Sequence, residues 1–148
     1  MKLSVQEEPF FPDGKIGHFS NQNQETGAIV TFLGKVRSDP ENPLEYMLIE
    51  HYPGMTEKAI EKIMGEAVKR WNLIDCLVIH RYGKLTPSED IVLVATSSKH
   101  RREAFEAADY LMDFLKSRAP FWKKEVTQRG ESWVESKEID EVALDRWK

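Results

Sequence analysis

The sequence has little of what several large protein classes depend on. It holds one cysteine, Cys76, among 148 residues, which rules out an intrachain disulfide and a cysteine-rich zinc or iron–sulfur site. No apolar run approaches the ~18 residues of a membrane span. The first residues, MKLSVQEEPFFPDG, place acids and prolines where a signal peptide has an apolar core, so a cytoplasmic location is expected.

An excess of positive charge is also missing. The net charge is −4, with 25 acidic against 21 basic residues, so the chain as a whole does not attract polyanions. An RNA-binding role would need a basic stripe interleaved with aromatic residues on a strand, and no such motif occurs. Nucleic acid is therefore not an expected partner, and any anion site must be local.

The chain does contain enough apolar sequence for a folded core. Its hydrophobic fraction of 41% and charged fraction of 31% are those of one globular domain, and no repeat or shift in composition marks a boundary. A single domain is expected over residues 1–148. It would have an N-terminal segment at 1–26 and a weakly helical C-terminal tail at 136–148.

The expected elements are strands and two amphipathic helices. Strands are predicted at 27–37, 44–52, 73–83 and 89–98, with short ones in FWKKEV and SWVES. The helices are predicted between the second and third strands, ending near Trp71, and from about Ser97 to Pro120. The first two strands flank the turn-rich SDPENP loop and are expected to pair as a long antiparallel hairpin. The result is an α+β domain.

The second predicted helix begins with cations, where the helix dipole disfavours them. Its first turn contains Lys99, His100, Arg101 and Arg102. Free N–H groups beside clustered cations form a good site for an anion, above all phosphate. The alternative is a solvated basic turn compensated by nearby acids, and the residues alone leave both alternatives open.

Three lysines surround the turn at Pro120. Lys116 falls inside the apolar stripe of the helix, so its ammonium either reaches solvent or is partly desolvated near other cations. Desolvation would lower its pKa and free its amine for nucleophilic or general-base work. Lys123 and Lys124 follow on a predicted strand and point to opposite faces, so only one of them can share a site with Lys116.

Three further observations limit the chemistry. Arg37 ends a predicted strand before the SDPENP loop, a usual place for a substrate contact, although a plain strand-end charge is the alternative. Cys76 lies among strand formers and is expected to be a buried, inert thiol. Histidines at metal-ligand spacing, a glycine-rich phosphate loop and a Ser or Cys nucleophile motif are all missing, so neither a metal nor another cofactor is expected.

Several motifs together resemble the large, catalytic subunit of molybdopterin synthase. They run in the family's order from about Gly27 to Glu135: GAIVTFLGKVR, IEHYPGMTEKAIEKI, IHRYGKL, TSSKHRREAFEAADYLMDFLKSRAPFWKKE and SWVE. The resemblance implies an α/β hammerhead-like domain. It also implies a sulfurtransferase that converts cyclic pyranopterin monophosphate into molybdopterin by installing a dithiolene.

The same resemblance implies an assembly. Each sulfur would arrive on a small ubiquitin-like subunit with a C-terminal Gly-Gly thiocarboxylate, whose tail enters a pocket on the large subunit. The large subunit would form a central homodimer with one small subunit at each end, a heterotetramer. The alternative is a non-catalytic module that binds a ubiquitin-like tail or a phosphorylated metabolite.

Within the resemblance, the family's pocket lysines fall on Lys116 and Lys123. Lys116 is assigned the closest contact with the partner's C-terminal carbonyl, as base or transient acyl acceptor. Lys123 is assigned to stabilise developing negative charge on the thiocarboxylate or the substrate. Lys124 is expected to be a bystander.

The resemblance also implies substrate-binding residues. The phosphate ligands fall on Arg37, His100 and Arg101, and the pocket lining falls on Phe32 and Met112. Some family members supply an arginine across the dimer from just after the WVE segment.

Two positions depart from the family's pattern. The position of the arginine after the WVE segment is Lys137 here, which puts a bidentate phosphate contact in doubt. The turn Pro87-Ser88-Glu89 replaces the family's Pro-Gly-Asp type, and this change is expected to alter the turn and not the chemistry.

Overall fold

Residues 1–134 and 138–148 are those that the computed structural model describes, and they form strands and helices of an α+β fold. The strands are β1 (Lys2–Gln6), β2 (Ala28–Lys35), β3 (Leu44–His51), β4 (Asp75–Arg81), β5 (Gly83–Leu85), β6 (Asp90–Ser98), β7 (Phe121–Thr127) and β8 (Gly130–Val134). The helices are α1 (Pro12–Ser20), α2 (Met55–Trp71), α3 (Arg101–Ser117) and α4 (Glu138–Ala143), followed by the 3-10 turn η1 (Leu144–Trp147). The α+β class is thus confirmed.

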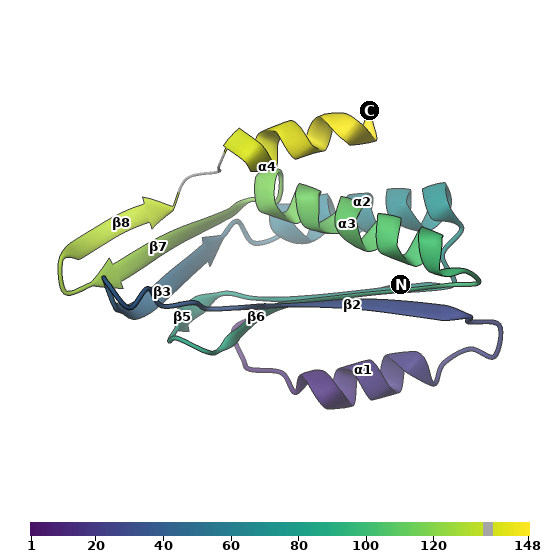
Figure 1. Cartoon of the computed structure of the whole chain (residues 1–148), viewed down its shortest axis with the longest axis horizontal. Helices are drawn as coiled ribbons and strands as arrows, with labels where there is room; N and C mark the ends of the chain where they lie inside the picture. The colour runs from purple at the N-terminus through teal and green to yellow at the C-terminus, as the bar shows by residue number, and fades with distance from the viewer. Residues whose placement is uncertain (135–137) are drawn as a thin grey trace.

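The strands are divided between two sheets. The first has the order β1-β4-β6-β2 and the second the order β5-β3-β7-β8. Helices α2 and α3 cover one face of the first sheet, α1 covers the other, and the second sheet extends from one end (Figure 1). Gly83 has a φ of 90°, in the left-handed region that favours glycine. The chain turns there, so the predicted strand 73–83 becomes β4 in one sheet and β5 in the other.

The predicted hairpin between segments 27–37 and 44–52 is wrong. β2 pairs with β6, whereas β3 pairs with β5 and β7, so the SDPENP loop carries the chain from one sheet to the other. The reason is that a strand pattern shows that a segment is extended but not which strand it pairs with. Next to β6, β2 can be packed by α3 on one face and α1 on the other.

The main core lies between the first sheet and helices α2 and α3. In β4, Cys76 and Val78 belong to this core, whereas Leu77 and Ile79 belong to a smaller one under α1. Burial raises the pKa of Cys76 to about 12, so the thiol stays protonated, as expected for an inert cysteine. Within the part of the chain that the structure describes, no helix is both long and apolar enough to cross a membrane.

The turn between β5 and β6 holds Ser88 at a φ of 76°. Its N–H donates to the carbonyl oxygen of Val36 at 2.8 Å, which fixes this conformation. A left-handed conformation costs a non-glycine residue about 1–2 kcal/mol. We expect Ser88→Gly to raise the free energy of unfolding by about 1 kcal/mol or less, because glycine's greater freedom in the unfolded chain offsets part of the gain. Urea denaturation measures this change, and a loss of stability would contradict it.

Candidate functional site

Lys123 lies on the inward face of the second sheet. Alternation along β7 puts Phe121 and Lys123 on the same face as Ile49, which is buried. The side chain of Lys123 is half-buried. Burial, and next the positive charge of Lys116, lower the pKa of Lys123, while Asp140 of α4 acts in the opposite direction. The amine of Lys123 is therefore easier to deprotonate than that of a surface lysine.

Lys116 lies in the last turn of α3 and is exposed. Of the two alternatives for this residue, the structure favours the one in which its ammonium reaches solvent, and the desolvation falls on Lys123 instead. The sequence predicts that Lys116 lies near other cations, and the cation that Lys116 approaches is Lys123, not Arg101. A rise of 1.5 Å per residue separates Arg101 and Lys116 by about 22 Å along α3. We call Lys116 and Lys123 the lysine site.

Lys124 points to the outer face of the second sheet, opposite to Lys123. Its Nζ lies 3.5 Å from Oε2 of Glu131 and 5.5 Å from the centre of the Trp133 ring, both on β8. Lys124 therefore interacts across the β7–β8 hairpin and takes no part in the lysine site, as the alternation predicted.

Phe32, Arg37 and Met112 lie toward the same end of the fold as the lysine site. Helix α3 runs back over the first sheet, so that its last turn lies where β2 ends and β6 begins (Figure 1). Arg37 is exposed just beyond β2. Phe32 is 39% exposed, and its ring lies over Gly34 nearer that end. Met112, one turn before Lys116, is half-buried against the main core.

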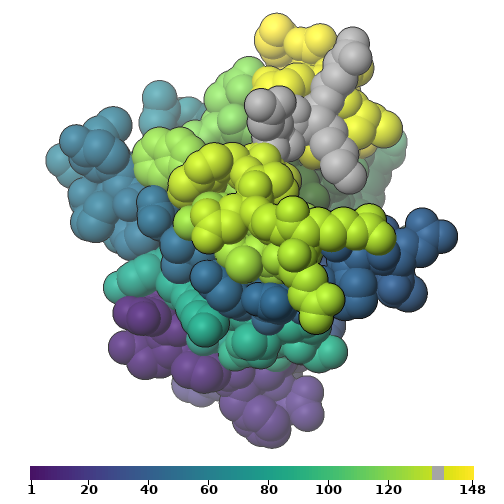
Figure 2. Space-filling view, turned by 90° about the vertical axis from the view of Figure 1, so that its left-hand side faces the viewer, coloured from purple at the N-terminus to yellow at the C-terminus, as the bar shows by residue number. Residues whose placement is uncertain are grey.

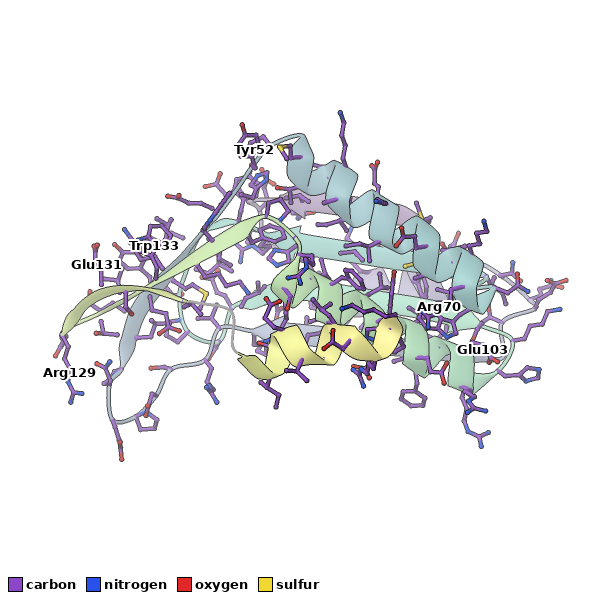
Figure 3. All side chains as sticks on the ribbon, turned by 90° about the horizontal axis from the view of Figure 1, so that it is seen from above. Tyr52, Arg70, Glu103, Arg129, Glu131 and Trp133 are labelled. Atoms are coloured by element: carbon purple, nitrogen blue, oxygen red, sulfur yellow. The ribbon has the colours of Figure 1, made fainter. Side chains whose placement is uncertain are left out.

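His100 and Arg101 lie at the other end of α3, and both are exposed. Figure 3 shows this separation: Glu103 marks the first turn of α3 at one end of the molecule, and Trp133 lies on the hairpin at the other. One chain therefore places five of the predicted residues toward the end that carries the second sheet, whereas His100 and Arg101 lie at the other end. Lys137, the remaining predicted residue, lies outside the described residues.

One residue beside the lysine site was not recognised from sequence. His80 of β4 is only 3% exposed, and its ring stacks on Phe121 with centres 3.8 Å apart and planes 14° apart. Burial is the main cause that lowers the pKa of His80, to about 3, and the positive charge of Lys123 is the second. The signal was available: alternation places His80 on the same face of β4 as Cys76 and Val78.

The described residues contain no group of three or more His, Cys, Asp or Glu side chains that could hold a metal ion. The two histidines near the site have other partners, since Nδ1 of His80 lies 2.8 Å from the carbonyl oxygen of Arg81 and Nδ1 of His51 lies 3.1 Å from the hydroxyl of Thr56. That the chain works without a cofactor stays a prediction.

Comparison with known proteins agrees with the resemblance. The family profile described as MoaE protein matches residues 5–118. The molybdopterin synthase catalytic subunit of Cereibacter sphaeroides is 59% identical over 147 residues, which are 99% of this chain and 100% of that protein. The subunit of the same name from Escherichia coli (strain K12) is 50% identical over 127 residues, 85% of each chain.

Solved structures give the same result. The molybdopterin biosynthesis MoaE protein from Burkholderia ambifaria superposes with a TM-score of 0.83 at 44% identity, covering 99% of this chain and 97% of that one. Molybdopterin synthase from Staphylococcus aureus superposes with a TM-score of 0.81 at 32% identity, covering 89% and 96%. The chain therefore belongs to the MoaE family of molybdopterin synthase catalytic subunits, sulfurtransferases of molybdenum cofactor biosynthesis.

Proposed function

We propose that this chain transfers sulfur from the C-terminal thiocarboxylate of a small ubiquitin-like subunit to cyclic pyranopterin monophosphate, forming the molybdopterin dithiolene. The observation that carries the proposal is the half-buried Lys123 beside Lys116, at the corner between α3 and β7. Acyl chemistry needs both a base and a positive charge at the carbonyl, and two lysines in different environments supply both. The protein-complex structure from Helicobacter pylori, described as subunits 1 and 2 of molybdopterin-converting factor, supports a small partner through its shared fold.

The burial pattern favours an exchange of the two roles assigned from sequence. The thiocarboxylate sulfur bonds to a substrate carbon as the bond from that carbon to an oxygen breaks, and the oxygen leaves with the electron pair. Water then attacks the acyl carbon, which breaks the acyl carbon–sulfur bond, leaves a carboxylate on the partner and leaves the sulfur on the substrate. Lys123, whose pKa is lowered, is suited to take the proton from that water. Lys116, exposed beside it, is suited to hold the negative charge that develops on the acyl oxygen.

A homodimer is part of the proposal, and the second sheet supports it. β8 is the edge of that sheet and is exposed along its whole length, with Trp133 54% and Val134 43% exposed. Trp122 of β7 is also 48% exposed. Figure 2 shows the β7–β8 hairpin prominent at this end of the molecule. An exposed sheet edge that carries large apolar side chains is normally buried against another chain. In the proposed homodimer, a second copy of this chain packs against that edge.

A homodimer would also account for the position of His100 and Arg101. Two protomers side by side in opposite directions would place the hairpin end of one next to the first turn of α3 of the other. His100 and Arg101 of one protomer would then bind the substrate phosphate at the lysine site of its partner. Supply of Lys137 across the dimer stays a prediction, as does a cytoplasmic location.

Replacing Arg101 by alanine should weaken binding of the cyclic pterin phosphate by about 1.5–3 kcal/mol, the usual scale of a charge-assisted hydrogen bond. Binding of the small subunit should change little, because the two contacts are separate. Arg102→Ala is the matched control: its Nε lies 3.3 Å from Oε1 of Glu106 in the same helix, so it should leave substrate binding nearly unchanged. Calorimetry measures both affinities. Unchanged affinity in Arg101→Ala would favour the solvated basic turn.

Reconstitution tests the proposed activity. The protein is mixed with the thiocarboxylated small subunit and the cyclic pterin phosphate, and the dithiolene product is detected after conversion to a fluorescent derivative. Product formation is expected. Tight binding of the small subunit without any product would instead favour the non-catalytic module.

A further inference from the structure

The His80–Phe121 ring pair joins the two sheets beside the lysine site. His80 belongs to β4 of the first sheet and Phe121 is the first residue of β7 in the second. The two rings are nearly parallel, and the imidazole is almost wholly buried. His51 of β3, which pairs with Phe121, has its ring centre 6.1 Å from that of Phe121. Phe121 is therefore held between side chains of both sheets.

The hydrogen bond of His80 determines which nitrogen carries its proton. A carbonyl oxygen only accepts, so Nδ1 donates its hydrogen to Arg81 and Nε2 keeps its lone pair. With a pKa of about 3 the ring is uncharged near neutral pH. A neutral ring can remain buried beside Lys123, whose positive charge would repel a protonated imidazole.

The position of Phe121 determines that of Lys123. The two residues are two apart on one face of β7, so a shift of Phe121 moves Lys123 with it. Among the described residues, Lys116 of α3, Asp140 of α4 and His80 of β4 are charged or titratable groups around Lys123, and His51 of β3 lies beside Phe121 and also acts on His80. Among them His80 is the one bound to the strand that carries Lys123 through a stacked ring.

We propose that His80 is a positioning residue: its neutral ring, stacked on Phe121, holds the start of β7 against β4 and keeps the amine of Lys123 half-buried. A stacked aromatic pair of this kind contributes about 0.5–1.5 kcal/mol beyond the area it buries. The importance of this contact for catalysis rests on the proposed function. The effect of the contact on the amine of Lys123 does not depend on the proposed function, so the role in catalysis and the effect on Lys123 are tested separately.

Competitive labelling measures the amine directly and needs no activity. The folded protein is treated with trace acetic anhydride from about pH 7 to about pH 11, and acetylation of Lys123 is followed by mass spectrometry. The urea-unfolded chain gives the reference titration of the same lysine. In the wild type, Lys123 should become reactive at lower pH than in the unfolded chain, because burial favours its neutral form.

The variants separate stacking from general stability. In His80→Gln the flat ring is lost and water reaches Lys123. The pH midpoint of Lys123 acetylation should therefore move up toward the value measured in the unfolded chain. One pKa unit changes the free amine about tenfold, so labelling at about pH 8 should fall about 3- to 10-fold. His80→Phe keeps a stacking ring and should keep the wild-type midpoint. Val78→Ala removes a buried side chain from the same face of β4 and should lower stability without moving the midpoint.

An unchanged Lys123 midpoint in folded His80→Gln would overturn the proposal, and so would a shift of equal size in Val78→Ala. If His80→Gln does not fold, Phe121→Leu removes the other ring of the pair and must produce the upward shift, or the proposal fails. Failure of the proposed function would be seen differently, as a wild-type protein with the expected labelling but no product in the reconstitution.

Discussion

Replacing Lys123 by alanine should lower the rate of dithiolene formation by on the order of a hundredfold or more, as removal of a preorganised catalytic group commonly does. Lys116→Ala should have an effect of similar size. Both side chains lie at the corner where α3 ends and β7 begins, and the proposed reaction uses one as base and the other as positive charge. Single-turnover assays with the thiocarboxylated partner measure the chemical step apart from product release.

Lys124→Ala is the matched control for these variants, because Lys124 is adjacent in β7 but pairs with Glu131 on the outer face. Its rate should stay near that of the wild type. A damaging Lys124→Ala together with a silent Lys123→Ala would contradict the assignment of strand faces.

The pH dependence of the reaction rate separates the roles of Lys116 and Lys123. If Lys123 is the base, the rate rises with pH through its lowered pKa, and loss of the Lys116 charge in a residually active variant moves that rise to higher pH.

Mixed dimers should restore activity that neither parent variant has. In a dimer of one Lys123→Ala protomer and one Arg101→Ala protomer, one site carries both substitutions and the other carries neither, provided that each site takes its lysines and its basic turn from different chains. Up to about half of the wild-type activity per dimer should then return. The physical reason is the separation of about 22 Å along α3, which keeps Arg101 away from Lys116 of its own chain.

The experiment uses two affinity tags, so that the mixed dimer is purified away from both parents. Light scattering should first show a dimer at micromolar concentration, and a monomer would count against the homodimer itself. Mixed dimers no more active than the parents would show that both residues act within one chain, or that the basic turn binds no substrate.

Sequence patterns predicted the local features of the site. The two-residue period of FWKKE was enough to place Lys123 and Lys124 on opposite faces, and Pro120 correctly marked the end of α3. The family motifs were specific enough to identify the enzyme class. These features depend on neighbours in the chain, which a sequence shows directly.

Features that depend on tertiary packing were not predicted. The expectation that Lys116 lies near other cations used its position around the helix, which gives no distance along the axis, and this hid its separation from Arg101. The N-terminal segment contains β1, which pairs in parallel with β4 and had no local partner to reveal it. The burial of Lys123 and its proximity to His80 arise where two sheets meet, from residues more than forty positions apart.

The most direct test of the central claim is a structure of the complex with the small subunit's C-terminal tail in place. We predict that the tail ends at the lysine site, with its terminal carbonyl oxygen within about 3 Å of the Nζ of Lys116 and with Lys123 beside the acyl carbon. A tail that ends at the first turn of α3, or anywhere that leaves both lysines without contact, would contradict the account.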